Sequence, residues 1–297
     1  ARAEGAPRVH ESREGNVLIR GNVERGDVGA VLDGADVVVT GAFTTGFVEH
    51  AYIEPEAAFA RRVGDRIEVQ VSTQAPHMNR TEIEAILGLP DGGVRILPTA
   101  VGGGFGSKLD ISVQPYVALA AWHLKRPARI AYTRPESMQS TTKRHPSELS
   151  VTIGARADGT LAGMDFFGRF NTGAYASWGP TVANRVPVHA SGPYVYEGYR
   201  ARTEAVHTNG PIAGAFRGFG VPQATIGTEA MLDELADALA IDRLEFRYRN
   251  ALTAGVPTVT GQVFEGGVGY RDCLDALRPH WERARRDAEA ANRASSR

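Results

Sequence analysis

Hydrophobic and polar residues alternate over several short stretches of the chain, a pattern that is typical of β-strands with one buried face. These stretches predict strands over Val37–Thr40, Phe43–Tyr52, Arg66–Ser72, Val94–Thr99, Arg129–Tyr132, Leu149–Ala155, Leu161–Phe167 and Ala201–His207. The dipeptide Asp158-Gly159 lies between two of them and is a strong hairpin signal. We therefore expect an antiparallel pair at this point.

Apolar residues recur at helical spacing elsewhere along the chain. The predicted helices are Thr73–Leu87, Asp110–Leu124, Pro222–Leu239, Leu244–Leu252 and Tyr270–Arg297. Gly88 and Pro90 are expected to end the first helix. The last helix is charged and becomes polar on every side beyond Trp281, so its end should be solvated or frayed. Because strands and helices are intermixed without a regular repeat, the predicted class is α+β, or mixed α/β.

The composition is that of an ordinary globular protein, with 297 residues, a formal net charge of −1 and 42% hydrophobic residues. This charge balance gives no sign of a nucleic-acid or membrane-surface partner. One cysteine, Cys273, excludes a disulfide framework, a zinc cluster or an iron–sulfur centre within the chain, and we expect it to pack inside a helix. The sequence has no starting Met, no signal core and no membrane-spanning stretch, which predicts a cytoplasmic piece of a longer protein.

Glycines gather in clusters that mark sharp turns or close approaches of the backbone. Residues 102–108 read GGGFGSK between a predicted strand and a predicted helix. This stretch fits an anion site made by backbone amides at a helix N-terminus, or a plain strand-to-helix turn. It has neither the G-x-G-x-x-G spacing nor the Gly-Lys-Ser/Thr ending of nucleotide-binding loops, which disfavours a nucleotide-binding protein. Another glycine cluster, at residues 261–269, is interpreted as part of an ordinary loop.

The second cluster, residues 214–220, reads GAFRGFG and leads directly into a predicted helix. Arg217 lies between two aromatic residues and two glycines. A guanidinium in this setting either binds an oxyanion in bidentate fashion or satisfies the carbonyl groups of its own loop. The motif alone leaves both interpretations open.

Taken together, these motifs resemble the molybdenum hydroxylase family, which includes xanthine dehydrogenase, aldehyde oxidase, carbon monoxide dehydrogenase and hydroxybenzoyl-CoA reductase. The resemblance rests on VEHAYIEPEAAFA (48–60), STQAPHMNR (72–80), VGGGFGSK (101–108), GAFRGFGVPQ (214–223) and LDELADALAIDRLEFRYRN (232–250). It implies that residues 14–255 are the first molybdopterin-binding segment of a large subunit. Residues 1–13 would then be a polar tail, and residues 256–297 a loop and charged helix leading to a second such segment.

The resemblance also implies specific roles. The residues expected at the molybdopterin are Gly104, Phe105, Gly106, Phe216, Arg217 and Gly218. Among these, Phe105 and Arg217 would lie next to the ligands of the molybdenum, which has no protein ligand in most members. Phe219 would form an aromatic wall against the substrate. Arg185 matches a substrate-binding arginine, although a surface or interface arginine is an equal alternative.

Other parts of such an enzyme are expected outside this chain. The resemblance places the general-base glutamate in a later segment, so no catalytic residue is expected here. Iron–sulfur clusters and FAD would belong to partner domains or subunits, which together with the rest of the large subunit are the expected partners. The isolated chain is accordingly expected to bind little molybdopterin. A non-catalytic or partner-docking remnant is the alternative.

Two positions depart from the purine-oxidising members. Leu109 stands where they have a glutamate, and Val48 where they have a glutamine. A leucine cannot hydrogen-bond a purine, so an aldehyde or N-heteroaromatic substrate is favoured. The neighbouring Asp110 is expected to cap the following helix.

Three further residues have a structural interpretation from the sequence alone. His50 is expected to be a satisfied core histidine rather than a metal ligand. Glu54 and Glu56 could form a paired-carboxylate site, but their spacing in an extended segment favours one shared exposed face.

Overall fold

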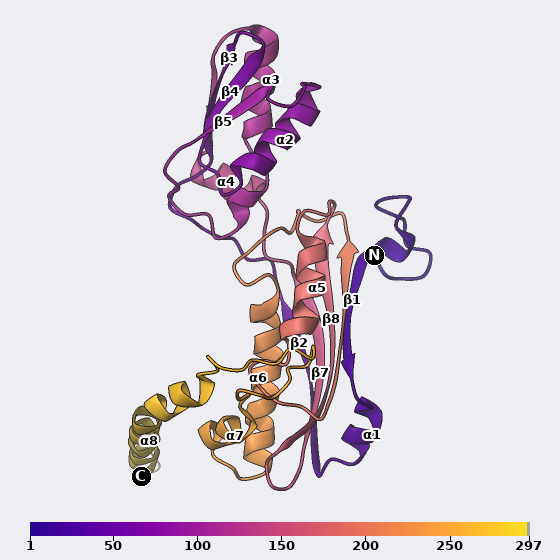
Figure 1. Ribbon diagram of the computed structural model, residues 1–297, viewed down its shortest axis with the longest axis vertical. Coiled ribbons are helices and arrows are strands. Elements are labelled where there is room, and N and C mark those ends of the chain that lie inside the picture. Colours follow the sequence, from indigo (N-terminus) through magenta and orange to yellow (C-terminus); the bar gives the residue numbers. More distant parts are fainter. Residues whose placement is uncertain (296–297) are drawn as a thin grey trace.

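The two strands on either side of Asp158-Gly159 form the centre of a five-stranded sheet (Figure 1). In the computed structural model, which describes residues 1–295, the strand order of this sheet is β1-β9-β8-β7-β2. Its strands are β1 Val17–Arg25, β2 Val37–Thr45, β7 Ser147–Ala155, β8 Leu161–Gly173 and β9 Gly198–His207. The predicted β7–β8 pair is antiparallel, whereas β8 and β9 are parallel and α5 (Gly179–His189) connects them.

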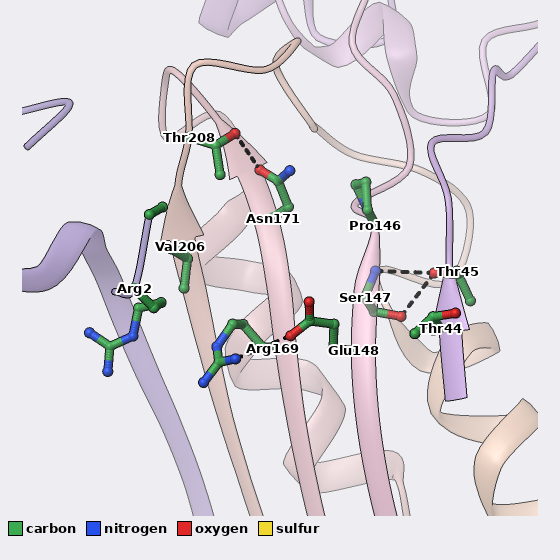
Figure 2. A pocket seen from close by; sticks show the side chains of 11 residues that line it. Arg2, Thr44, Thr45, Pro146, Ser147, Glu148, Arg169, Asn171, Val206 and Thr208 are labelled. Atoms are coloured by element: carbon green, nitrogen blue, oxygen red, sulfur yellow. Dashed lines mark hydrogen bonds and ion pairs between the residues drawn. The ribbon is translucent and has the colours of Figure 1, made fainter. Parts of the chain in front are cut away.

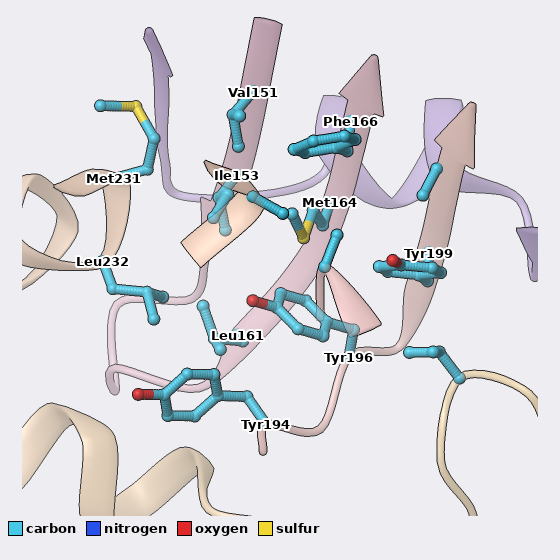
Figure 3. Close-up of a cluster of buried hydrophobic side chains, with 14 of the residues drawn as sticks. Val151, Ile153, Leu161, Met164, Phe166, Tyr194, Tyr196, Tyr199, Met231 and Leu232 are labelled. Atoms are coloured by element: carbon cyan, nitrogen blue, oxygen red, sulfur yellow. The ribbon is translucent and has the colours of Figure 1, made fainter. Parts of the chain in front are cut away.

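Two helices cover one face of this sheet. Helix α5 packs on β1 and β9, and α6 (Val221–Ala238) packs on β2 and β7. Between helices and sheet lies the main core, in which Phe166 and Tyr199 are completely buried (Figure 3). Burying one such side chain contributes about 1.5–3 kcal/mol, so this core is the chief stabiliser of the lobe. The short helix α1 (Val28–Asp33) packs on the opposite face.

A smaller sheet forms a second lobe (Figure 1), with the strand order β5-β4-β3-β6. Its elements are β3 Ala57–Val63, β4 Arg66–Val71, α2 Pro76–Leu87, β5 Val94–Pro98, α3 Gln114–Leu124, β6 Ala128–Ala131 and α4 Arg134–Ser140. Helix α2 connects the parallel strands β4 and β5 and ends at Gly88 with φ +65°, as its sequence predicts. Its Ile83 joins Val69 and Val117 in a separate core.

Two extended crossings, residues 46–56 and 141–146, connect the lobes (Figure 1). The strand predicted over Phe43–Tyr52 is therefore wrong beyond Thr45, because the chain leaves the sheet there. The crossings bind each other: the Arg144 amide donates to the Val48 carbonyl at 2.9 Å, and Lys143 Nζ lies 2.6 Å from Glu49 Oε2.

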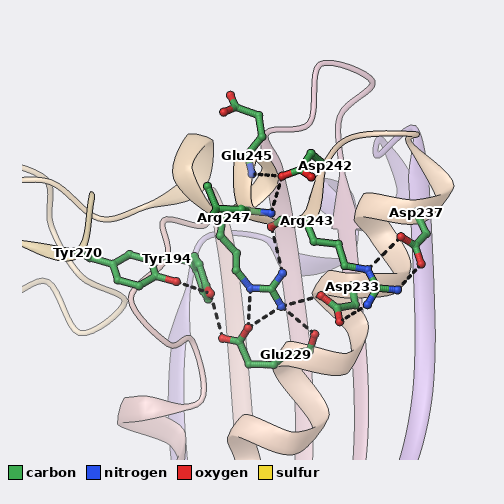
Figure 4. Close-up of polar contacts among 10 residues, drawn as sticks. Tyr194, Glu229, Asp233, Asp237, Asp242, Arg243, Glu245, Arg247 and Tyr270 are labelled. Carbon is green, nitrogen blue, oxygen red and sulfur yellow. Dashed lines mark hydrogen bonds and ion pairs between the residues drawn. The ribbon is translucent and has the colours of Figure 1, made fainter. Parts of the chain in front are cut away.

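Helices α7 (Arg243–Asn250) and α8 (Tyr270–Ser295) continue from α6. Figure 4 shows the polar cluster that binds α7 to α6, in which the Arg247 guanidinium contacts Glu229 and Asp233. Cys273 lies in α8, but the prediction that its side chain is a packing residue of that helix is wrong. The Cys273 side chain is exposed, and the neighbouring Leu274 is buried instead.

The predicted class, α+β or mixed α/β, is confirmed. Several elements escape the sequence patterns, namely β1, α1, β3, α4 and α5. Pro187 lies inside α5, and a proline at this position disfavours a helix when only the sequence is considered. The helix forms nevertheless, because Val182, Ala183 and Val186 are buried on one side of α5 and hold it on the sheet. Within the described residues no helix combines the length and the apolar character that crossing a bilayer requires.

Candidate functional site

The first glycine loop follows β5 and takes conformations that side chains resist. The φ angles are +98° at Gly103 and +113° at Gly106, and a Cβ at Gly104 would lie 2.4 Å from Gln74 Oε1. Phe105 itself has φ +51°, and its side chain is 49% exposed. A bulky residue at positive φ is uncommon and requires fixed surroundings. The loop therefore holds the backbone of Phe105 at the surface in one conformation.

This loop does not lie at the N-terminus of an α-helix, contrary to the prediction. A single 3₁₀ turn, Ser107–Leu109, follows it, and α3 begins only at Gln114. Asp110 does not cap α3 either, because its carboxylate accepts a hydrogen bond from Ser177. Without a helix dipole behind it, the loop can attract an anion only through its own amides and the side chains around it.

The second glycine loop is shaped by three consecutive residues with positive φ, +91° at Gly218, +46° at Phe219 and +86° at Gly220. The Arg144 guanidinium donates to the carbonyls of Phe216 (3.4 Å) and Arg217 (2.8 Å). One sequence-based alternative was that Arg217 satisfies the carbonyl groups of its own loop. Arg144 takes this role instead. The motif gave no signal for Arg144, which lies 72 and 73 residues away from the two carbonyls.

The two glycine loops are in direct contact. The amide of Arg217 donates to the Phe105 carbonyl at 2.9 Å. A Cβ at Gly106 would lie 2.7 Å from the Ala215 carbonyl oxygen, so glycine is required for this approach. Segments from the two lobes thereby form one surface.

His50 packs beneath the second loop. Its Nε2 lies 2.7 Å from the carbonyl oxygen of Ala215, and its ring stacks on Phe216 at 4.0 Å between centroids. Burial, helped by the charges of Lys143 and Arg144, lowers the pKa of His50 despite the opposing effects of its hydrogen bond to Ala215 and of the Glu49 charge. The imidazole is therefore neutral at pH 7 and donates its Nε2 proton to Ala215. The described residues contain no group of three or more His, Cys, Asp or Glu placed to bind a metal.

Several donors along the two loops have no acceptor among residues 1–295. They include the amides of Gly104, Phe105, Phe216 and Gly218 and the guanidinium of Arg217. Such donors bind the oxygens of a polar or anionic ligand. The Phe105 side chain, which is 49% exposed, adds an apolar surface beside these donors.

An aromatic wall borders the second loop. The rings of Phe219 and Trp178 meet edge to face with centroids 5.9 Å apart, and the Arg185 guanidinium lies 5.3 Å from the centre of the Phe219 ring. Arg185 and Phe219, both assigned to substrate on the sequence, are thus neighbours. Trp178, the residue before α5, has no counterpart in the sequence-based assignment.

A partly buried ion pair supports the first loop. Lys108 is 4% exposed, and its Nζ lies 2.7 Å from Glu54 Oε2, which also accepts from the Gly102 amide at 2.6 Å. Burial raises the pKa of Glu54, but hydrogen bonds from Lys108, Gly102 and Ser72 outweigh it and hold this pKa below its usual value. The ionised pair therefore ties the loop to the 46–56 crossing.

The shared exposed face predicted for Glu54 and Glu56 is wrong. Glu56 is 4% exposed and accepts a hydrogen bond from the Tyr52 hydroxyl. Burial, together with this bond, raises the pKa of Tyr52 to about 12, so the phenol remains a donor at physiological pH.

Replacing Lys108 with methionine should destabilise the protein. It leaves the Glu54 carboxylate half-buried without its cation, which is expected to cost about 2–3 kcal/mol because Glu54 keeps some access to water. Chemical denaturation of the purified protein measures this loss. The exposed Lys125→Met variant is the matched control and should change the free energy of unfolding by less than about 0.5 kcal/mol. Equal stability of the two variants would contradict the prediction.

Another hollow lies on the outer face of the five-stranded sheet (Figure 2). It has a volume of about 360 Å³ and is lined by polar residues, among them Glu148 and Arg169, which form an ion pair at 3.1 Å. Its charges are already paired and no glycine loop reaches it, so the two contacting loops remain the candidate site.

Comparison with known proteins agrees with this geometry. The model of the molybdopterin cofactor-binding domain family matches residues 9–251, which contain both glycine loops and the aromatic wall. The chain belongs to this family. The resemblance seen in the sequence is thereby confirmed, and molybdopterin is the cofactor of this domain.

Relatives of the molybdopterin cofactor-binding domain include the nicotinate dehydrogenase large molybdopterin subunit of Eubacterium barkeri, which is 41% identical over 93% of this chain and 64% of its own length. The xanthine dehydrogenase molybdenum-binding subunit of Escherichia coli O157:H7 is 34% identical, over 98% of this chain and 39% of its own. The aldehyde oxidoreductase structure from Desulfovibrio gigas superimposes with a TM-score of 0.93 at 32% identity, covering 98% of this chain and 32% of that one. The chain thus spans 32–64% of the length of these relatives.

Proposed function

We propose that this chain forms one side of the molybdopterin site of an oxidoreductase that hydroxylates an aldehyde or an N-heteroaromatic carbon. The observation that carries the proposal is the contact between the two glycine loops, which gathers free amides and the Arg217 guanidinium on one surface. The relatives support it, because they are oxidoreductases named for nicotinate, xanthine and aldehydes.

The residues present fit the cofactor. The free amides of Gly104, Phe105, Phe216 and Gly218 and the Arg217 side chain are the groups that would hold its oxygen and phosphate atoms. When bound, the cofactor supplies two-electron oxidation of a substrate C–H group, with the new oxygen coming from water. The chain's own residues orient that group and exclude water from one side.

The substrate side is proposed to be the wall of Phe219, Trp178 and Arg185. Phe219 and Trp178 would contact a flat ring, and Arg185 would bind an anionic substituent of it. Leu109 adds an apolar side chain where a purine would need a hydrogen-bond partner. Val48, which is 50% exposed, likewise offers no polar side chain. We therefore favour an aromatic carboxylate such as nicotinate over a purine.

Replacing Arg185 with methionine should separate anionic from neutral substrates. A lost charge-assisted hydrogen bond is worth about 1.5–3 kcal/mol, so KM for nicotinate should rise at least about 10-fold. KM for pyridine-3-carbaldehyde, which lacks the carboxylate, should change less than about twofold. Steady-state kinetics of the complete enzyme give both values. An equal rise for both probes would assign Arg185 to the fold or an interface.

Partners are part of the same proposal. Cys273, the one cysteine of these 297 residues, cannot by itself ligate an iron–sulfur cluster. The two electrons would therefore leave through iron–sulfur and FAD-containing domains or subunits. The general base is proposed to come from another segment of the large subunit.

The proposal is tested on the large subunit that contains residues 1–297, purified with its partners. Molybdenum and released pterin should be near one per subunit, and at least one aldehyde or N-heteroaromatic probe should be oxidised with oxygen from ¹⁸O-labelled water. Absence of molybdenum and activity would instead indicate a non-catalytic docking remnant.

A further inference from the structure

Asp110 connects the two lobes at a point that the proposed chemistry does not use. Both of its carboxylate oxygens lie within hydrogen-bond distance of the Ser177 hydroxyl, at 3.0 and 2.9 Å. Asp110 follows the first glycine loop in the smaller sheet's lobe, and Ser177 lies between β8 and α5 in the larger one. Ser177 has φ +38°, a conformation that a non-glycine residue holds only when its surroundings fix it.

A third segment meets the same pair. A Cβ at Gly214, the first residue of the second glycine loop, would lie 2.8 Å from Asp110 Oδ2 and equally close to the Ser177 hydroxyl and the Thr142 side chain. The carboxylate and hydroxyl therefore occupy the space that any side chain at position 214 would need. Asp110, Ser177 and Gly214 form what we call the three-segment junction.

Two residues of the three-segment junction are chain neighbours of residues that we assign to the proposed substrate site. Asp110 follows Leu109, and Ser177 precedes Trp178, which contacts Phe219. A shift of either segment would therefore move one wall of the substrate site relative to the other. Within residues 1–295, the Ser177 hydroxyl forms hydrogen bonds with Asp110 alone.

We propose that Asp110 is a positioning residue, which fixes the distance between Leu109 and the wall of Trp178, Phe219 and Arg185 through its bond to Ser177. The inference rests on the proposed function, because it assigns this wall to the substrate. Asp110 itself does not touch the substrate. Its effect is expected on KM more than on kcat.

The surroundings of Asp110 give the junction a pH dependence. It borders a cavity of about 620 Å³, lined by hydroxyl groups and by two other ionisable residues, Glu82 of α2 and Tyr175. Burial, and to a lesser degree the Glu82 charge, raise the pKa of Asp110 to about 6 against the Ser177 hydrogen bond. Above this pH the ionised carboxylate offers both oxygens to Ser177, and below it one of them carries a proton.

As the pH rises through the pKa of Asp110, stability should fall while substrate binding becomes tighter. The folded pKa of Asp110 lies above its unfolded value, so its contribution to stability is present at low pH and is lost as the pH rises through about 6. The bond to Ser177 is strongest in the ionised form, so KM should fall over the same pH range. A purely structural carboxylate would move stability alone.

The test uses the complete enzyme with nicotinate as the probe. D110A and S177A should each raise KM about 5- to 10-fold, leave kcat within about twofold and keep the molybdenum content, and the double variant should add nothing further. D110N should remove the change of KM between pH 5 and 7.5. D65N, which alters a fully exposed acid, is the control and should resemble the unaltered enzyme.

A second measurement needs no activity. The part of the acrylamide quenching that disappears when Trp178 is replaced by phenylalanine reports the exposure of Trp178 in the complete enzyme, and this part should increase about twofold in D110A and S177A. Unchanged quenching and unchanged KM would overturn the inference while the enzyme still holds molybdenum. If the unaltered enzyme holds none, the proposed function fails, and quenching alone decides whether Asp110 positions Trp178. If D110A does not fold, S177A, which removes one hydroxyl, carries both measurements.

Discussion

Substituting Gly106 with alanine is expected to abolish retention of molybdenum and to reduce activity at least about 100-fold. The added Cβ would lie 2.7 Å from the Ala215 oxygen, 2.8 Å from the Ala215 carbonyl carbon and 3.1 Å from the Phe216 amide nitrogen. All three are backbone atoms, so no flexible side chain can move aside. The two glycine loops must separate, which breaks the bond between the Arg217 amide and the Phe105 carbonyl.

Gly92→Ala is the control that separates this clash from backbone strain. Gly92 also has a positive φ, +81°, but a Cβ there would meet nothing within 4 Å. It should therefore show only the conformational cost, about 1 kcal/mol, with full molybdenum content and activity. Metal analysis and steady-state assays of both variants decide the matter. If Gly106→Ala retained cofactor and activity like Gly92→Ala, the contact between the loops would not be what organises the site.

Replacing Arg217 with methionine should lower kcat/KM at least about 100-fold and weaken cofactor retention while leaving the fold intact. Its guanidinium has no partner among residues 1–295, so its removal exposes no orphaned group. The free energy of unfolding should change by less than about 0.5 kcal/mol. Arg217→Lys should recover only part of the activity, because an ammonium cannot reproduce bidentate binding.

Arg126→Met, which alters an exposed arginine in the smaller lobe, is the control for lost positive charge. It should match the unaltered enzyme in kcat/KM, molybdenum content and stability. A large loss of stability in Arg217→Met, together with unchanged kcat/KM per molybdenum, would show that Arg217 serves the loop rather than the ligand. Arg144 already bonds the carbonyls of Phe216 and Arg217, so we expect the opposite outcome.

Prediction from the sequence succeeded where the decisive interactions are local. The alternation around Asp158-Gly159 predicts the β7–β8 hairpin, and Gly88 ends α2 in the left-handed conformation that glycine permits. It failed where packing overrides local preference. Helix α5 contains Pro187, and the segment after Thr45 looks like a strand although it crosses between the lobes.

The sequence by itself determined the family of the site and the glycines at its two loops, because positive φ and close backbone approach leave little choice of residue. Only the tertiary structure decided which groups meet there. It brought Arg217 to Phe105, set Arg144 and His50 around Phe216, and placed Trp178 beside Phe219. These contacts join residues far apart in the chain, and the packing of two lobes, rather than any local propensity, fixes their geometry.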